Sequence, residues 1–94
     1  FSELNFLPSV IDLAEAGIIP GGTKRNFEHI KNYVEFGEGI TNTQKLLMAD
    51  AQTSGGLLIS MNPRDAKIYV DSLYTDAKII GKISDKSTHL IQVS

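Results

Sequence analysis

The sequence predicts an α+β domain with a mainly antiparallel sheet and helices packed on it. Three short segments with apolar residues at helical spacing come first, and a strand, a helix and two further strands follow. Glycines separate these elements, because glycine readily adopts the backbone angles that turns require. A run of helices followed by hairpin-forming strands is typical of α+β folds and not of alternating α/β folds.

The first helix is predicted over residues 7–16. Its apolar residues recur at i, i+3, i+4 and i+7, which places them on one face of a helix. Pro8 stands in the first turn, where its missing N–H costs nothing, and Gly17 is placed to end the helix in the left-handed conformation. We therefore expect a short amphipathic helix.

Two more helices are predicted in the first half of the chain. In the second helix, Thr23 is placed to cap the first turn through its hydroxyl. Three apolar residues share one face of that helix: Phe27, Ile30 and Val34. Thr41 and Gln44 have the spacing of a capping box, so a third helix is expected to start there and to end near Asp50.

The second half of the chain predicts the sheet and one more helix. Residues 57–61 form a nearly continuous apolar run, which suits a central strand covered on both faces. Asn62 as cap and Pro63 as first helical residue then start a helix with apolar residues at Ala66, Tyr69, Val70 and Leu73. Residues 77–83 and 89–93 alternate in polarity on either side of a polar turn, so they are expected to pair as a hairpin.

Composition narrows the possible functions. With 94 residues and a net charge of −2, the chain is too short for a multidomain enzyme and carries no basic surface for nucleic acid. No run of about 18 apolar residues or export leader is seen, so we expect no membrane association and a cytoplasmic location. There are no cysteines, and His29 and His89 lie too far apart for a local metal site. We assign no catalytic residue and no metal ligand.

Two glycine-containing segments are candidates for ligand binding. In the first, Gly21, Gly22 and Thr23 open a helix, where free backbone N–H groups accept anions. Lys24 and Arg25 follow and are compatible either with an anion or with a solvated helix face. The alternative is a simple sharp turn between two helices, which a pair of glycines also explains.

The second candidate is the polar run that leads from Asp50 to Gly56. Its last four residues offer two hydroxyls and two positions for close backbone approach: Thr53, Ser54, Gly55 and Gly56. Asp50 is suited to a magnesium-bound water, but the lysine of a phosphate-binding P-loop is absent. The alternative is a connection from helix to strand in which these residues satisfy backbone groups. We predict that the two candidate segments face each other across a groove.

Two stretches together resemble a known family. They are Ala-Gly-Ile-Ile-Pro-Gly-Gly-Thr-Lys-Arg-Asn at residues 16–26 and Leu-Leu-Met-Ala-Asp-Ala-Gln-Thr-Ser-Gly-Gly-Leu-Leu-Ile at residues 46–59. The pair closely resembles the C-terminal domain of selenophosphate synthetases, also called selenide, water dikinases, and the resemblance runs from about Leu7 to Ile83. One departure is Ala51, where the family pattern usually has proline, and this loosens the entry to the loop but removes no reactive group.

The resemblance implies an ATP-dependent phosphotransferase that makes selenophosphate from selenide, ATP and water and releases AMP and phosphate. It implies the fold shared with aminoimidazole ribonucleotide synthetase, with N-terminal domains that dimerise and carry most of the ATP and magnesium site. The family's reactive cysteine or selenocysteine, its lysine and its magnesium-binding aspartates lie upstream of the matched part. The chain, which starts at Phe1 and not at methionine, is therefore expected to be one partial domain, residues 1–94, and to be inactive alone.

Within that implied enzyme, both candidate segments are expected to form walls of the phosphate-side cleft. A different class of function also fits the second half of the chain, namely a βαββ-type module that binds a small metabolite at a subunit interface. A third possibility is that these residues serve only to pack two domains together.

Overall fold

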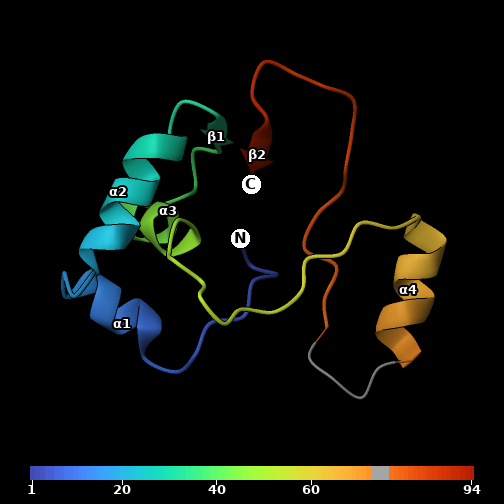
Figure 1. Cartoon of the computed structure of the whole chain (residues 1–94), viewed down its shortest axis with the longest axis horizontal. Coiled ribbons are helices and arrows are strands. Elements are labelled where there is room, and N and C mark those ends of the chain that lie inside the picture. The colour runs from blue at the N-terminus through green and yellow to red at the C-terminus, as the bar shows by residue number, and fades with distance from the viewer. Residues whose placement is uncertain (73–76) are drawn as a thin grey trace.

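The structure is a computed structural model that describes residues 1–72 and 77–94 (Figure 1). Within these residues, helices and strands follow one another in the order α1 (Val10–Glu15), α2 (Gly21–Ile30), β1 (Val34–Phe36), α3 (Asn42–Met48), α4 (Pro63–Ser72) and β2 (Ile91–Val93). Helices α1, α2 and α3 gather beside the two strands, and α4 lies apart from them (Figure 1). The described residues include no helix long and apolar enough to cross a membrane.

Helix α1 confirms the predicted first helix, in a shorter form. It begins at Val10, because the preceding Ser9 has a φ of 65° and cannot belong to a right-handed helix. Pro8 therefore precedes the helix instead of standing in its first turn. Gly17 has a φ of 81°, and its N–H donates to the carbonyl of Ala14 at 3.0 Å, so the predicted left-handed stop is confirmed.

Helix α3 has the predicted capping box, whereas α2 is not capped as predicted. The Thr41 N–H donates to Gln44 Oε1 at 2.9 Å, and the Gln44 N–H donates to Thr41 Oγ1 at 3.2 Å. Helix α2 begins directly after Pro20 and has no side-chain cap. Thr23 lies inside α2 with its hydroxyl turned to a different partner, so the prediction that it caps the helix was wrong.

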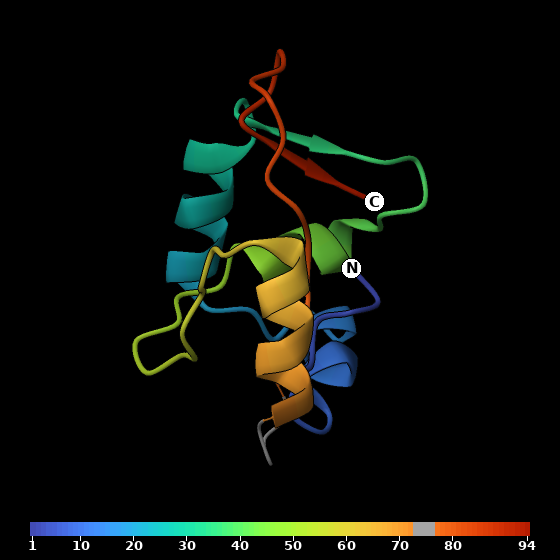
Figure 2. The same ribbon diagram turned by 90° about the vertical axis from the view of Figure 1, so that its right-hand side faces the viewer.

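Within the described part of the chain the sheet has two strands, and they run parallel, so the predicted antiparallel sheet was wrong. Val34 pairs with Ile91 and Phe36 with Val93, in the same chain direction. The strands run side by side above α3 (Figure 2). Val34 was predicted to extend the apolar face of the second helix, but α2 ends at Ile30 and a turn intervenes, so that Val34 starts β1 instead.

Two predicted strands are not formed, and a third is formed with another partner. Residues 57–61 and 77–83 are not strands, because no neighbouring strand in the described part of the chain supplies their backbone hydrogen bonds. Residues 89–93 contain β2, which pairs with β1 and not with residues 77–83. The described residues of the second half therefore hold one helix and one strand, and no βαββ unit.

Helix α4 starts as predicted. Asn62 Oδ1 accepts a hydrogen bond from the N–H of Arg64 at 2.9 Å, and Pro63 is the first helical residue. The predicted apolar face includes Leu73, which lies outside the described residues. The faces of α4 are largely open to solvent, since Ile68 and Tyr69 are both exposed.

The buried core is small and joins the first three helices to the sheet. Among the described residues, its buried apolar residues are Ala14, Val34 and Ala49, one each from α1, β1 and the end of α3. At its edge, the Phe36 ring lies 6.2 Å from the ring of Phe27, and the ammonium of Lys45 lies 5.4 Å from the Phe36 ring centre. This core fixes α2 and α3, which carry the two candidate segments.

Candidate functional site

The two candidate segments meet at Thr23 and Asp50. Thr23 is 2% exposed, and its hydroxyl donates a hydrogen bond to Oδ1 of Asp50. Asp50 follows α3 and is half-buried. A carboxylate after the C-terminus of α3 is unfavourable for the dipole of that helix, but here it faces the first turn of α2, where negative charge is favourable. The contact thus ties the start of the polar run to the start of α2.

A second hydrogen bond holds the same junction one turn further along α2. The side-chain amide of Asn26 donates to the carbonyl oxygen of Ala49 at 3.0 Å. Thr23 and Asn26 are three residues apart in α2 and therefore lie on neighbouring positions of one helix face. We call the two bonds, Thr23 to Asp50 and Asn26 to Ala49, the α2–α3 clamp.

A hollow of about 160 Å³ lies beside the clamp. Its walls come mainly from apolar side chains of α1, α3 and the turn before α2, with Thr23 and Asp50 as the polar groups. None of the residues 53–56 lines it. The structure therefore brings Thr23 and Asp50 together in one hollow, while the groove predicted between residues 21–23 and residues 53–56 stays a prediction.

The first turn of α2 combines free backbone donors with a guanidinium group. Gly21 and Gly22 lie at the N-terminus of a ten-residue helix without a side-chain cap. A Cβ at Gly21 would lie 3.5 Å from one terminal nitrogen of Arg25, and a Cβ at Gly22 would lie 4.0 Å from the other. The Arg25 side chain therefore folds back over the glycines. This arrangement of N–H groups and a cation is suited to an anion such as phosphate.

The loop of residues 53–56 is exposed throughout. Gly55 lies against the Gln52 side chain, whose Cβ would be 3.0 Å from a Cβ placed at Gly55, whereas Gly56 has open space around it. A side chain at position 55 would push Gln52 aside by a few tenths of an ångström, so the turn favours glycine there. The hydroxyls of Thr53 and Ser54 are accessible, and their predicted contact with a cofactor stays a prediction.

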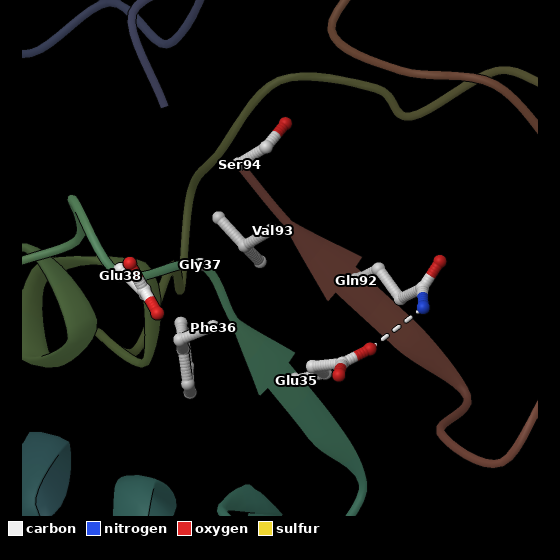
Figure 3. Close-up of a pocket in the computed structure, with 7 residues that line it drawn as sticks. All are labelled: Glu35, Phe36, Gly37, Glu38, Gln92, Val93 and Ser94. Atoms are coloured by element: carbon white, nitrogen blue, oxygen red, sulfur yellow. Dashed lines mark hydrogen bonds between the residues drawn. The ribbon is translucent and has the colours of Figure 1, made fainter.

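A second and larger hollow, of about 440 Å³, lies between the ends of β1 and β2 (Figure 3). Gln92 Nε2 donates to Glu35 Oε2 at 2.6 Å across the strand pair, and Nδ1 of His89 lies 3.8 Å from the same oxygen. The sequence interpretation gave Glu35, Glu38 and His89 no role, and it missed Gln92. No local signal joins these residues, because β1 and β2 are more than fifty positions apart.

Neither hollow holds a set of metal ligands. In the residues that the structure describes, no group of three or more histidine, cysteine, aspartate or glutamate side chains is arranged to hold a metal ion. Asp50, the carboxylate closest to both candidate segments, already accepts the hydroxyl of Thr23. The chemistry that the described residues support is therefore binding of an anion by N–H, hydroxyl and guanidinium donors.

The curated relatives of this chain are dikinases. The chain is 35% identical to the selenide, water dikinase of Aliarcobacter butzleri over 99% of its length. It is 40% identical to that of Campylobacter jejuni over 99% of its length, and 43% identical to that of Myxococcus xanthus over 86%. Over most of its length the chain is therefore similar to a segment of proteins named selenide, water dikinase, as the two sequence motifs predicted.

The match covers only part of each relative. The chain spans about a quarter of their length, 28% of the Aliarcobacter protein, 27% of the Campylobacter protein and 25% of the Myxococcus protein. This share is consistent with the predicted C-terminal fragment. No protein-family model matches the chain, and no solved structure matches it.

Proposed function

We propose that this chain is part of a selenide, water dikinase, a phosphotransferase that makes selenophosphate from selenide, ATP and water and releases AMP and phosphate. The observation that carries the proposal is the similarity over nearly the whole chain to curated proteins of that name. The paired motifs around Thr23 and Asp50 support it, because the fold brings them into direct contact.

In this proposal the chain is one partial domain, and its partners are the N-terminal domain of the same polypeptide and a second copy in a cytoplasmic homodimer. Magnesium is bound mostly by residues outside the chain. Asp50 is a single carboxylate already engaged by Thr23, which is too few oxygen ligands for a magnesium site on its own. When bound, ATP supplies the phosphoryl group, and the residues of this chain hold and orient phosphate oxygens.

The phosphate-side wall is proposed to consist of two parts with different roles. Gly21 and Gly22 present backbone donors under the Arg25 guanidinium, and Thr53, Ser54, Gly55 and Gly56 present accessible hydroxyls and N–H groups. Thr23 belongs to the wall through its backbone, since its buried hydroxyl already donates to Asp50. The carboxylate of Asp50 repels a phosphate placed directly on it, so the phosphate is expected nearer the glycines and Arg25.

The first prediction tests whether the chain depends on the rest of the enzyme. The purified 94-residue chain is expected to form no AMP from ATP in the presence of selenide, because phosphoryl transfer requires metal-held and positioned phosphates. The complete protein, expressed from the reading frame that encodes the chain, is expected to form AMP under the same conditions. Selenide-dependent AMP production by the chain alone would overturn the division of the site proposed here, and its absence from the complete protein would overturn the proposed activity.

The second prediction tests Arg25 in the complete protein. Arg25→Gln keeps a polar but shorter side chain and removes the positive charge over Gly21 and Gly22. It is expected to raise the KM for ATP about two- to fivefold, the effect of one solvent-exposed ionic contact. Lys24→Gln is the matched control, because it removes the same charge from the neighbouring exposed position. Equal effects of the two variants would show that only the overall charge of α2 matters.

A further inference from the structure

The α2–α3 clamp is the last side-chain attachment before a long exposed segment. After Asp50, residues 51–61 are all exposed. Among the described residues, the next hydrogen bonds after the clamp are those accepted by Asn62 at the start of α4. The direction in which the loop 53–56 leaves the body of the molecule is therefore set at Ala49 and Asp50.

The backbone bonds at the end of α3 do not orient that junction relative to α2. The N–H groups of Ala49 and Asp50 donate to carbonyls of the same helix, those of Leu46 and Leu47, at 3.0 and 3.3 Å. These bonds end α3 but make no connection to another element. Only the side chains of Thr23 and Asn26 make hydrogen bonds, among those of the described residues, from α2 to this junction.

Because Thr23 is buried, water cannot readily replace Asp50 as the partner of its hydroxyl. Thr23 as a residue is only 2% exposed, so its hydroxyl cannot exchange Asp50 for water without opening the contact between α2 and α3. Asn26 is exposed, and its amide can reach water if the bond breaks. The clamp thus consists of a hydrogen bond from the buried Thr23 and a hydrogen bond from the exposed Asn26. The two residues lie three positions apart on the helix that carries Gly21 and Gly22.

We propose that Thr23 and Asn26 are positioning residues that act through Asp50 and Ala49 to hold the loop 53–56 in a fixed place relative to the first turn of α2. The inference rests on the proposed function in one respect, since it takes both segments as walls of one phosphate-side cleft. Neither Thr23 nor Asn26 needs to touch the nucleotide through its side chain. Their role is to keep the donors of the loop 53–56 at a fixed position relative to the backbone donors of Gly21 and Gly22.

The test uses the complete protein and compares Thr23→Val with Thr23→Ser. Valine has nearly the shape of threonine but no hydroxyl, and serine keeps the hydroxyl. Thr23→Val is expected to speed amide hydrogen exchange about tenfold at Ala49 and Asp50, whose N–H groups are hydrogen-bonded at the end of α3. It is also expected to raise the KM for ATP about three- to tenfold with a smaller change in kcat, because the loop is misplaced and not chemically altered. Thr23→Ser is expected to keep both the exchange rate and the KM for ATP close to those of the unchanged protein.

A second variant keeps the proposal open to disproof if Thr23→Val does not fold. Asn26→Ala removes the exposed half of the clamp and is expected to change exchange at Ala49 and Asp50, and the KM for ATP, in the same direction but less. Thr88→Val, at an exposed loop position, is the control for the threonine-to-valine change itself.

The outcomes separate the inference from the function on which it rests. Faster exchange at Ala49 and Asp50 together with an unchanged KM supports the clamp and removes the loop from the ATP site. A raised KM without faster exchange, or unchanged exchange in a folded Thr23→Val or Asn26→Ala protein, overturns the positioning role. If the Thr23→Ser protein shows the same defect as the Thr23→Val protein, the positioning role is also overturned, because the hydroxyl would then not be the group that matters.

Discussion

At micromolar concentration, the isolated 94-residue chain is expected to sediment as dimers or larger species. The reason is the nearly continuous apolar run at residues 57–61, which was predicted as a central strand and is instead exposed. Leu57 is 91% exposed and Leu58 is 84% exposed. Reburial of one such leucine in a contact between chains contributes about 1.5–3 kcal/mol, and the outer edges of β1 and β2 offer unpaired backbone groups as well.

The contribution of the run is measured by a charge placed within it. Leu57→Lys is expected to weaken association by at least about tenfold, because an ammonium group cannot be buried there without a partner. Ala51→Lys adds the same charge at an exposed position outside the run and is expected to change association little. A wild-type chain that stays monomeric at every concentration would show that the apolar run closes onto the chain itself in solution.

Local boundary signals explain which parts of the fold the sequence could predict. The capping box of Thr41 and Gln44, the start of α4 at Asn62 and Pro63, and the stop at Gly17 each depend on groups within four residues of one another. Such contacts are visible as spacings in the sequence. For that reason all four helices were predicted in the right order, with ends shifted by a few residues.

The sheet could not be predicted in the same way, because strand pairing is decided by distant residues. The apolar run at 57–61 has the composition of a strand, but a strand exists only where a neighbour supplies its hydrogen bonds. The short segments Val34–Phe36 and Ile91–Val93 carry weaker patterns, and yet they pair across more than fifty residues. Their parallel direction follows from the path of the chain between them and not from either pattern.

The candidate site was predicted as two segments that face each other, but the hydrogen bond that joins Thr23 to Asp50 was not predicted. Thr23 and Asp50 are 27 residues apart, so no spacing rule connects them. One signal was available: Thr23, Phe27 and Ile30 fall at i, i+4 and i+7, so Thr23 continues the apolar face of α2. A hydroxyl on a buried face requires a partner, and an aspartate after the next helix is a suitable acceptor.

The same junction should be sensitive to its packing as well as to its hydrogen bonds. Ala49 is 5% exposed at the end of α3, and its carbonyl accepts the amide of Asn26. Ala49→Leu adds three carbon atoms where α2 and α3 meet and is expected to lower the free energy of unfolding by about 1–3 kcal/mol. For a domain of this size that corresponds to a fall in Tm of about 4–8 °C for each kcal/mol.

Ala51→Leu is the matched control, because the same change two residues later falls at an exposed position. Its free energy of unfolding is expected to stay within about 0.5 kcal/mol of the parent. Urea unfolding of the 94-residue chain measures both variants, at one protein concentration, because association adds to apparent stability. If Ala49→Leu and Ala51→Leu lower the free energy of unfolding equally, Ala49 is not enclosed in solution. In that case α2 and α3 do not pack as closely as the clamp requires. A cost confined to Ala49 places the start of the loop 53–56 on a rigid support, which a phosphate-side wall needs in order to present its donors at fixed positions.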